Sequence, residues 1–98
     1  MADCTYCRTR WSHGLQTYPK EIWSELGGYR FEVRRLEVFA DGTMLWTSPE
    51  ESAGADAGAT PLPDLAELAD DPDCEEAAVV TAEQFETIWA RRREHRRG

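Results

Sequence analysis

Three cysteines and a histidine are the residues of this chain that could bind a metal ion. Cys4 and Cys7 form a Cys-x-x-Cys pair, which His13 and Cys74 could complete as a zinc site. On an extended strand, however, residues three apart point to opposite faces, and the two residues between these cysteines are poor turn formers. We therefore expect no metal or other cofactor, and a thiol in the core at Cys7.

Catalytic motifs are missing from the sequence. His13 could form an acid–base pair with Glu25 or Glu37, but no nucleophile motif, Gly-rich phosphate loop or H-E-x-x-H stretch accompanies it. We therefore expect that the protein is not an enzyme and has no catalytic residues. A metal-dependent or small-molecule activity around His13 and the cysteines is a third hypothesis, after the two binding functions considered below.

The net charge of −8 is distributed in three blocks. Residues 1–35 carry six Lys or Arg and four acids, residues 36–90 carry fourteen acids and no Lys or Arg, and residues 91–98 carry five Arg and one Glu. The acidic block would repel nucleic acid and anionic membranes and would attract a basic partner, in a salt-dependent way. It could also serve only to keep the protein soluble.

Alternating apolar residues predict a small antiparallel sheet. The strands are residues 5–11, 20–26, 29–40 and 43–48, with two-residue hairpin turns at Gly27-Gly28 and Asp41-Gly42. The first turn would pair Glu25 with Arg30 and Glu21 with Arg34, two favourable opposite-charge pairs.

The third strand changes the parity of its apolar residues after Val33. A β-bulge at Arg34-Arg35 would keep these residues on one face, and a straight strand covered on both sides is the alternative. With the bulge, a single core face would carry Ile22, Leu26, Tyr29, Phe31, Val33, Leu36, Val38 and Leu45.

Two helices follow a flexible loop over residues 49–62, which is rich in Ala, Gly, Glu and Pro. Residues 63–71 predict a short helix, and "EAAVV" a short strand. Thr81 begins the last helix with a "TAEQ" capping box, and its apolar side chains share one face. Residues 91–98 form a basic helix end or tail. We thus predict a single domain, residues 1–98, of the α+β class: an antiparallel meander of about four strands covered on one face by two helices.

The face opposite the predicted core combines aromatic and charged residues, which is typical of a protein-binding surface. Its apolar members are Trp23, Phe39, Met44 and Trp46. The residues expected to bind a partner are Trp23, Arg30, Glu32, Arg34, Glu37 and Trp46. Alternatively, loop 49–62 folds over the tryptophans, or this face forms a homodimer.

The basic tail supports an alternative function, binding of nucleic acid. Its candidate contacts are Arg91, Arg92, Arg93, Arg96 and Arg97, together with arginines of the sheet. Arginines at the carboxyl end of a helix also complement its dipole while remaining solvated, and this interpretation needs no nucleic acid.

Several stretches resemble a bacterial family of short, acidic, uncharacterised domains. They are "WSH" at 11–13, "IWSEL" at 22–26, "YRFEVRRLEVFADGTMLW" at 29–46, "PLPDLAELADDPD" and "TAEQFETIW". The resemblance covers about residues 5–90, and "EVRRLEVFADG" is its most specific part. This family has no activity to carry over, although its small acidic form is similar to that of immunity proteins, which neutralise toxins.

These patterns together predict a non-catalytic protein-binding domain. It would be an immunity- or antitoxin-like inhibitor or a small regulatory adaptor, whose partner is a basic protein such as a toxin or other effector. No apolar run is long enough to span a bilayer and no signal-peptide pattern begins the sequence, so we expect a cytoplasmic location.

Overall fold

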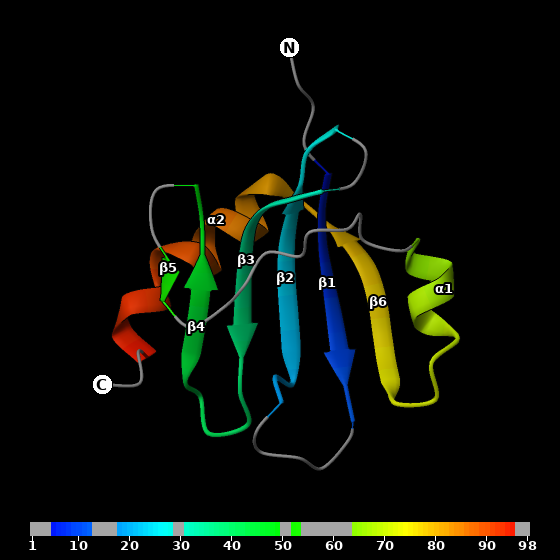
Figure 1. Ribbon diagram of the computed structural model, residues 1–98. Helices are drawn as coiled ribbons and strands as arrows, with labels where there is room; N and C mark the ends of the chain where they lie inside the picture. Colours follow the sequence, from blue (N-terminus) through cyan, green and yellow to red (C-terminus); the bar gives the residue numbers. More distant parts are fainter. Residues whose placement is uncertain (1–4, 13–17, 29–30, 50–51, 54–63, 96–98) are drawn as a thin grey trace.

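The computed structural model describes residues 5–12, 18–28, 31–49, 52–53 and 64–95 (Figure 1). The strands are β1 (Thr5–Trp11), β2 (Glu21–Leu26), β3 (Glu32–Val38), β4 (Met44–Thr47), β5 (Ser52–Ala53) and β6 (Cys74–Val80). The helices are α1 (Leu65–Ala69) and α2 (Ala82–Ala90), followed by a 3₁₀ helix, η2 (Arg92–His95).

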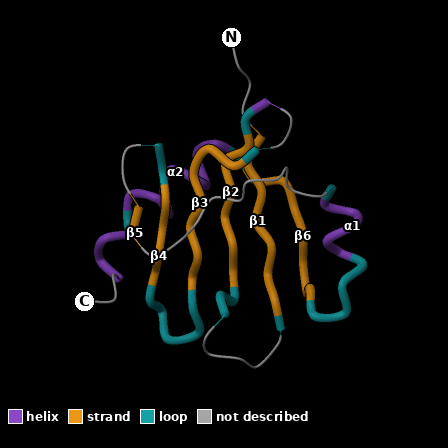
Figure 2. Tube along the Cα trace, in the orientation of Figure 1, coloured by secondary structure: helices purple, strands orange, loops and turns teal. Residues whose placement is uncertain are grey.

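Within these residues the strands form one six-stranded antiparallel sheet in the order β5-β4-β3-β2-β1-β6. The first five strands are a meander, and β6 returns to pair with β1; the labelled strands of Figure 2 follow this order. The α+β class is therefore confirmed. The sheet has more strands than the four expected, because "EAAVV" lies in a full strand and Ser52 pairs with Thr47 inside the predicted loop.

The two helices lie in different places. Helix α2 lies behind the strands in Figure 1, whereas α1 lies beyond β6. Leu68 of α1 lines a hollow together with Cys7 and Ser24. The side chains of Cys7 and Ser24 lie on the side of the sheet that faces away from α2. The prediction that both helices cover the same face of the sheet is therefore not confirmed, because α1 contacts the side opposite α2. Neither α1 nor α2 has the length and apolar character needed to cross a membrane, within the part of the chain described.

The core lies between the sheet and α2. Cross-strand pairs set Trp23 beside Leu36, and Leu36 beside Trp46. Phe85 and Trp89 from α2 cover them, with their ring centroids 5.9 Å apart. This side of the sheet is called the α2 face below, and the opposite side, which carries Cys7, Thr9, Ile22, Ser24 and Arg35, is called the far face.

This arrangement corrects the predicted core face. Ile22 and Leu26 lie on the far face, Leu36 and Val38 lie on the α2 face, and Phe31 is exposed. The cause is the register of β2 and β3: Leu26 pairs with Glu32 and Glu25 with Arg34, so the connection is longer than two residues. The irregularity therefore falls at Val33, one residue before the predicted bulge. This register buries large indole rings, which contribute more to the core than the aliphatic side chains of the predicted face.

The Asp41-Gly42 turn is present in a longer form. Gly42 has a φ of 88°, a conformation that favours glycine, and the Phe39 amide donates to the Thr43 carbonyl at 2.9 Å. The additional loop residue shifts the register by one from that of a two-residue turn, so Val38 pairs with Met44.

Helix α2 begins as its sequence predicts. The Gln84 amide donates to the Thr81 hydroxyl at 3.0 Å, and the Thr81 amide donates to the Gln84 side chain at 2.9 Å. This capping box fixes the start of the helix, so that Phe85 and Trp89, four residues apart, both face the sheet.

Candidate functional site

The predicted aromatic anchors are core residues. Only 8% of Trp23 and 1% of Trp46 is exposed, and Phe39 and Met44 are also buried. A partner could not contact these side chains without unfolding the domain. The prediction that Trp23 and Trp46 lie on an exposed binding face is therefore wrong, because the face assigned to the partner is the one that α2 covers.

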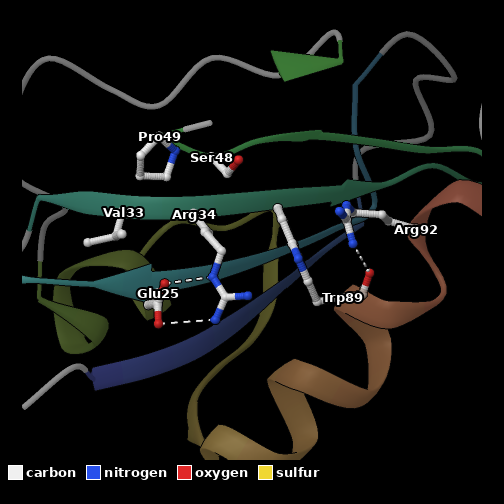
Figure 3. Close-up of a pocket in the computed structure, with 7 residues that line it drawn as sticks. All are labelled: Glu25, Val33, Arg34, Ser48, Pro49, Trp89 and Arg92. Carbon is white, nitrogen blue, oxygen red and sulfur yellow. Dashed lines mark hydrogen bonds and ion pairs between the residues drawn. The ribbon is translucent and has the colours of Figure 1, made fainter. Parts of the chain in front are cut away.

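Arg34 lies at the centre of a network between the sheet and α2 (Figure 3). Its Nε donates to Glu25 Oε1 at 2.7 Å and its Nη2 to Glu25 Oε2 at 3.1 Å. Its Nη1 also donates to Glu86 Oε1 at 3.0 Å. The guanidinium lies 4.8 Å from the ring centroid of Phe85 and 5.0 Å from that of Trp89. One arginine thus joins a strand carboxylate, a helix carboxylate and two core rings.

This network shifts the acidity of its members. Hydrogen bonds from Arg34 hold the pKa of Glu25 below its usual value of 4.5, against the opposing effect of burial, and the Tyr6 hydroxyl contributes a further hydrogen bond of 2.9 Å. The pKa of Arg34 is raised, chiefly by its hydrogen bond with Glu86. Both groups are therefore charged at neutral pH.

A pocket of about 310 Å³ lies beside this network. Its lining residues, drawn in Figure 3, are Glu25, Val33, Arg34, Ser48, Pro49, Trp89 and Arg92. Trp89 lies between the guanidinium groups of Arg34 and Arg92, and the latter donates to the Trp89 carbonyl at 3.0 Å. Arg34 already gives four hydrogen bonds to two carboxylates, so its chemistry here is to fasten α2 to the sheet.

A second cluster joins two other predicted binding residues on the far face. Arg35 Nη1 is 3.1 Å from both carboxylate oxygens of Glu32, and its Nε donates to Glu37 Oε2 at 2.8 Å. Burial lowers the pKa of Arg35, but the charges of Glu32 and Glu37 outweigh this effect and raise it overall. Glu32 and Glu37 are thus on the opposite side of the sheet from Arg34, and the predicted residues do not form one surface.

The arginines proposed to bind nucleic acid also lie in different surroundings. Arg91 is exposed at the end of α2. The guanidinium of Arg92 lies 4.3 Å from the ring centroid of Trp89, and that of Arg93 lies 5.6 Å from that of Trp46. These two side chains therefore contribute to the packing of η2 against the core.

The structure also shows a group of carboxylates outside these networks. On α1, the following turn and the start of β6, five acids are exposed and make no ion pair with any described residue. They are Glu67, Asp70, Asp71, Asp73 and Glu75, and we call them the acidic edge. The acidic block of the sequence indicated their charge, although only the structure shows which acids have no arginine beside them among the residues it describes.

Sequence reasoning missed a hollow on the far face, lined by Trp11, Tyr18, Pro19, Ile22 and Arg35. The available signal was the alternation of Cys7, Thr9 and Trp11 along the first strand, since the structure places all three on the far face.

Several predicted residues lie outside the described residues: Cys4, His13, Arg30, Arg96 and Arg97. Cys7 is 2% exposed, in agreement with a core thiol. Burial and the nearby Asp71 raise the pKa of the Cys74 thiol. The described residues contain no cluster of three or more potential metal ligands.

The family model of DUF6881, a domain of unknown function, matches residues 5–94. No curated protein and no solved structure matches the chain.

Proposed function

We propose that this chain, which belongs to the DUF6881 family of domains of unknown function, is a non-catalytic protein-binding domain that holds a basic partner at its acidic edge. The supporting observation is that the five carboxylates of the acidic edge are exposed and make no ion pair among the described residues.

Among the described residues, four arginines pair with six other carboxylates. On the sheet, Glu21 pairs with Arg10, and Glu76 pairs with Arg8. The acidic edge has no such partner among the described residues, so its negative potential would extend into solvent and accelerate encounter with a positively charged surface. Binding of this kind weakens as salt increases.

The partner class follows from this charge. A toxin or other effector with a basic active site would be inhibited by occlusion, because the carboxylates would occupy the positions of its anionic substrate. A regulatory adaptor would use the same contact without inhibition. The immunity-like role is thus the finer form of this proposal.

The alternative, binding of nucleic acid, has less support in the described residues. Arg92 and Arg93 pack on tryptophan rings, and an overall charge of −8 opposes a polyanion.

The test is affinity capture from the native cell with three proteins, at low and high salt, followed by identification of bound proteins and nucleic acid. The first is the wild type, and the second carries Glu67→Gln, Asp70→Asn and Glu75→Gln. Asp71 is left intact because its Oδ1 accepts a hydrogen bond from the Asp73 amide at 2.8 Å. The control carries Glu83→Gln, Thr87→Lys and Ala90→Lys, which change the net charge equally on exposed positions of α2.

We expect a basic protein that the wild type and the control retain at low salt and that the acidic-edge variant loses. Equal capture by all three proteins would contradict the proposal. Capture of nucleic acid without a protein would favour the alternative function.

A further inference from the structure

The hollow on the far face is an apolar site next to the acidic edge. It has a volume of about 250 Å³ and lies where β1 ends and β2 begins. Trp11, Pro19 and Ile22 supply apolar walls, and Tyr18, which is 59% exposed, stands at its opening. An apolar side chain entering this hollow would leave water.

A second hollow adjoins the first on the far face. Trp11, Ile22 and Arg35 also line a neighbouring hollow of about 210 Å³, which reaches the buried side chains of Cys7 and Ser24. Together the two hollows form a groove across β1 and β2. We call it the far-face groove.

Arg35 determines which polar group the far-face groove can accept. Its Nη1 and Nε donate to Glu32 and Glu37, whereas its Nη2 has no acceptor among the described residues. A neutral acceptor such as a peptide carbonyl is compatible with this donor.

The groove and the acidic edge share helix α1. Leu68 lines the second hollow, while Glu67 and Asp70 of the same segment are exposed to solvent. A ligand in the groove therefore lies close to carboxylates that make no ion pair within the part of the chain described.

We propose that the far-face groove binds an extended segment of a partner protein in which an apolar side chain is flanked by Lys or Arg. The apolar side chain would fill the groove, a backbone carbonyl would accept from Arg35, and the basic residues would face the acidic edge. This inference rests on the proposed function and adds the anchor that charge alone does not supply. Charge complementarity selects this occupant over a second copy of the chain, which carries the same net charge of −8.

The experiment uses two fluorescein-labelled five-residue peptides, each with two lysines on either side of a central residue. The central residue is leucine in one and serine in the other. Fluorescence anisotropy measures the affinity of each peptide for the intact protein. We expect the leucine peptide to bind about tenfold more tightly, because only leucine gains from burial.

Three variants locate the contact. Tyr18→Ser removes a wall of the groove and should abolish the preference for leucine. Phe31→Ser, the control, removes another exposed aromatic residue and should leave the preference unchanged. The acidic-edge variant Glu67→Gln, Asp70→Asn, Glu75→Gln should weaken both peptides by the same factor.

The outcomes separate this inference from the proposed function. Equal binding of the two peptides, with both weakened in the acidic-edge variant, would overturn the groove and support the acidic edge. A leucine preference without any effect of the acidic-edge variant would support the groove and contradict the proposed function. Absence of binding to both peptides would contradict both. Self-association of the free protein that Tyr18→Ser abolishes would instead assign the groove to a second copy.

Discussion

The carboxylates of the sheet and those of the acidic edge differ in what surrounds them. Five glutamates of the sheet and Glu86 of α2 each pair with an arginine of the sheet, and four of these pairs involve Arg34 or Arg35. On α1 and the start of β6, five carboxylates follow one another without any described cation beside them. The two regions belong to the same small domain but use the same chemical group in different ways.

This difference separates charges that stabilise the fold from charges that do not. A carboxylate such as Glu25, held by two hydrogen bonds from Arg34 and one from Tyr6, loses those bonds if the sheet or α2 moves. The acidic edge gains nothing comparable from folding, because its like charges repel one another. The acidic edge is therefore available for the proposed binding, or for keeping the protein soluble, and not for stabilising the fold.

The largest change in the free energy of unfolding is expected for Trp46→Ala. This variant tests the core between the sheet and α2. Removal of this buried indole should lower the free energy of unfolding by about 3–5 kcal/mol, because a cavity remains where α2 and the sheet meet. Urea denaturation measures the change.

Val79→Ala is the control for this change, because Val79 is 66% exposed, and it should alter stability by less than about 0.5 kcal/mol. If both variants unfolded at the same urea concentration, Trp46 would not be a core residue. If Trp46→Ala does not fold at all, the milder Trp46→Phe should still show a loss.

The next largest change in the free energy of unfolding is expected for Arg34→Met, which removes the cation that pairs with Glu25 and Glu86. The variant leaves Glu25 buried without its cation, so the free energy of unfolding at pH 7 should fall by about 2–3 kcal/mol. The matched variant Arg10→Met breaks a pair with Glu21 at 3.4 Å whose side chains are more exposed, and it should cost less than about 0.5 kcal/mol. Equal losses would show that position within the network does not matter.

The pH dependence of Arg34→Met sharpens this test. The pKa of Glu25 is lowered in the folded wild type, so its contribution is present above about pH 4.5 and is lost as the pH falls through the lower folded value. The difference between wild type and Arg34→Met should therefore shrink on acidification. A difference that stayed constant from pH 7 to pH 3 would assign the loss to packing on Phe85 and Trp89 instead.

The smallest effect on stability is expected in the acidic edge. Glu67→Gln, Asp70→Asn and Glu75→Gln together should change the free energy of unfolding by no more than about 0.5 kcal/mol, with a slight gain because repulsion is relieved. Thermal unfolding at low and high salt measures this. A marked destabilisation would give these carboxylates a structural role and remove the contrast with the sheet.

The sequence was most informative where local chemistry decides the structure. Thr81 and Gln84 form the predicted capping box, and Gly42 adopts the positive φ that its turn requires. Each of these features involves neighbouring residues only, so the pattern is sufficient to predict it.

The faces of the sheet depended on a longer-range feature. The connection after Leu26 is longer than predicted, and this changes which face of β3 lies beside Trp23. Both faces of the hairpin carry apolar residues. Alternation alone could not choose between Ile22 and Trp23 for the core. The choice depends on packing against Phe85 and Trp89, which lie some sixty residues away in the chain.

The candidate site was predictable only in part for a related reason. The charge blocks indicated an acidic surface, but arginines from residues 8–35 pair with acids as distant as Glu76 and Glu86. Which carboxylates remain available to a partner is a result of these long-range pairs.

The position of β6 beside β1 also has a kinetic consequence. Tyr6 pairs with Val80, so the outer neighbour of β1 is synthesised long after β1 itself. Until Cys74–Val80 has left the ribosome, β1 is an edge strand with unpaired backbone groups, and such strands can pair with other chains. Completion of the sheet requires closure of a long loop, a slow step compared with the formation of the hairpins. The nascent chain should therefore depend on dilution or on a chaperone during this interval, until β6 closes the sheet.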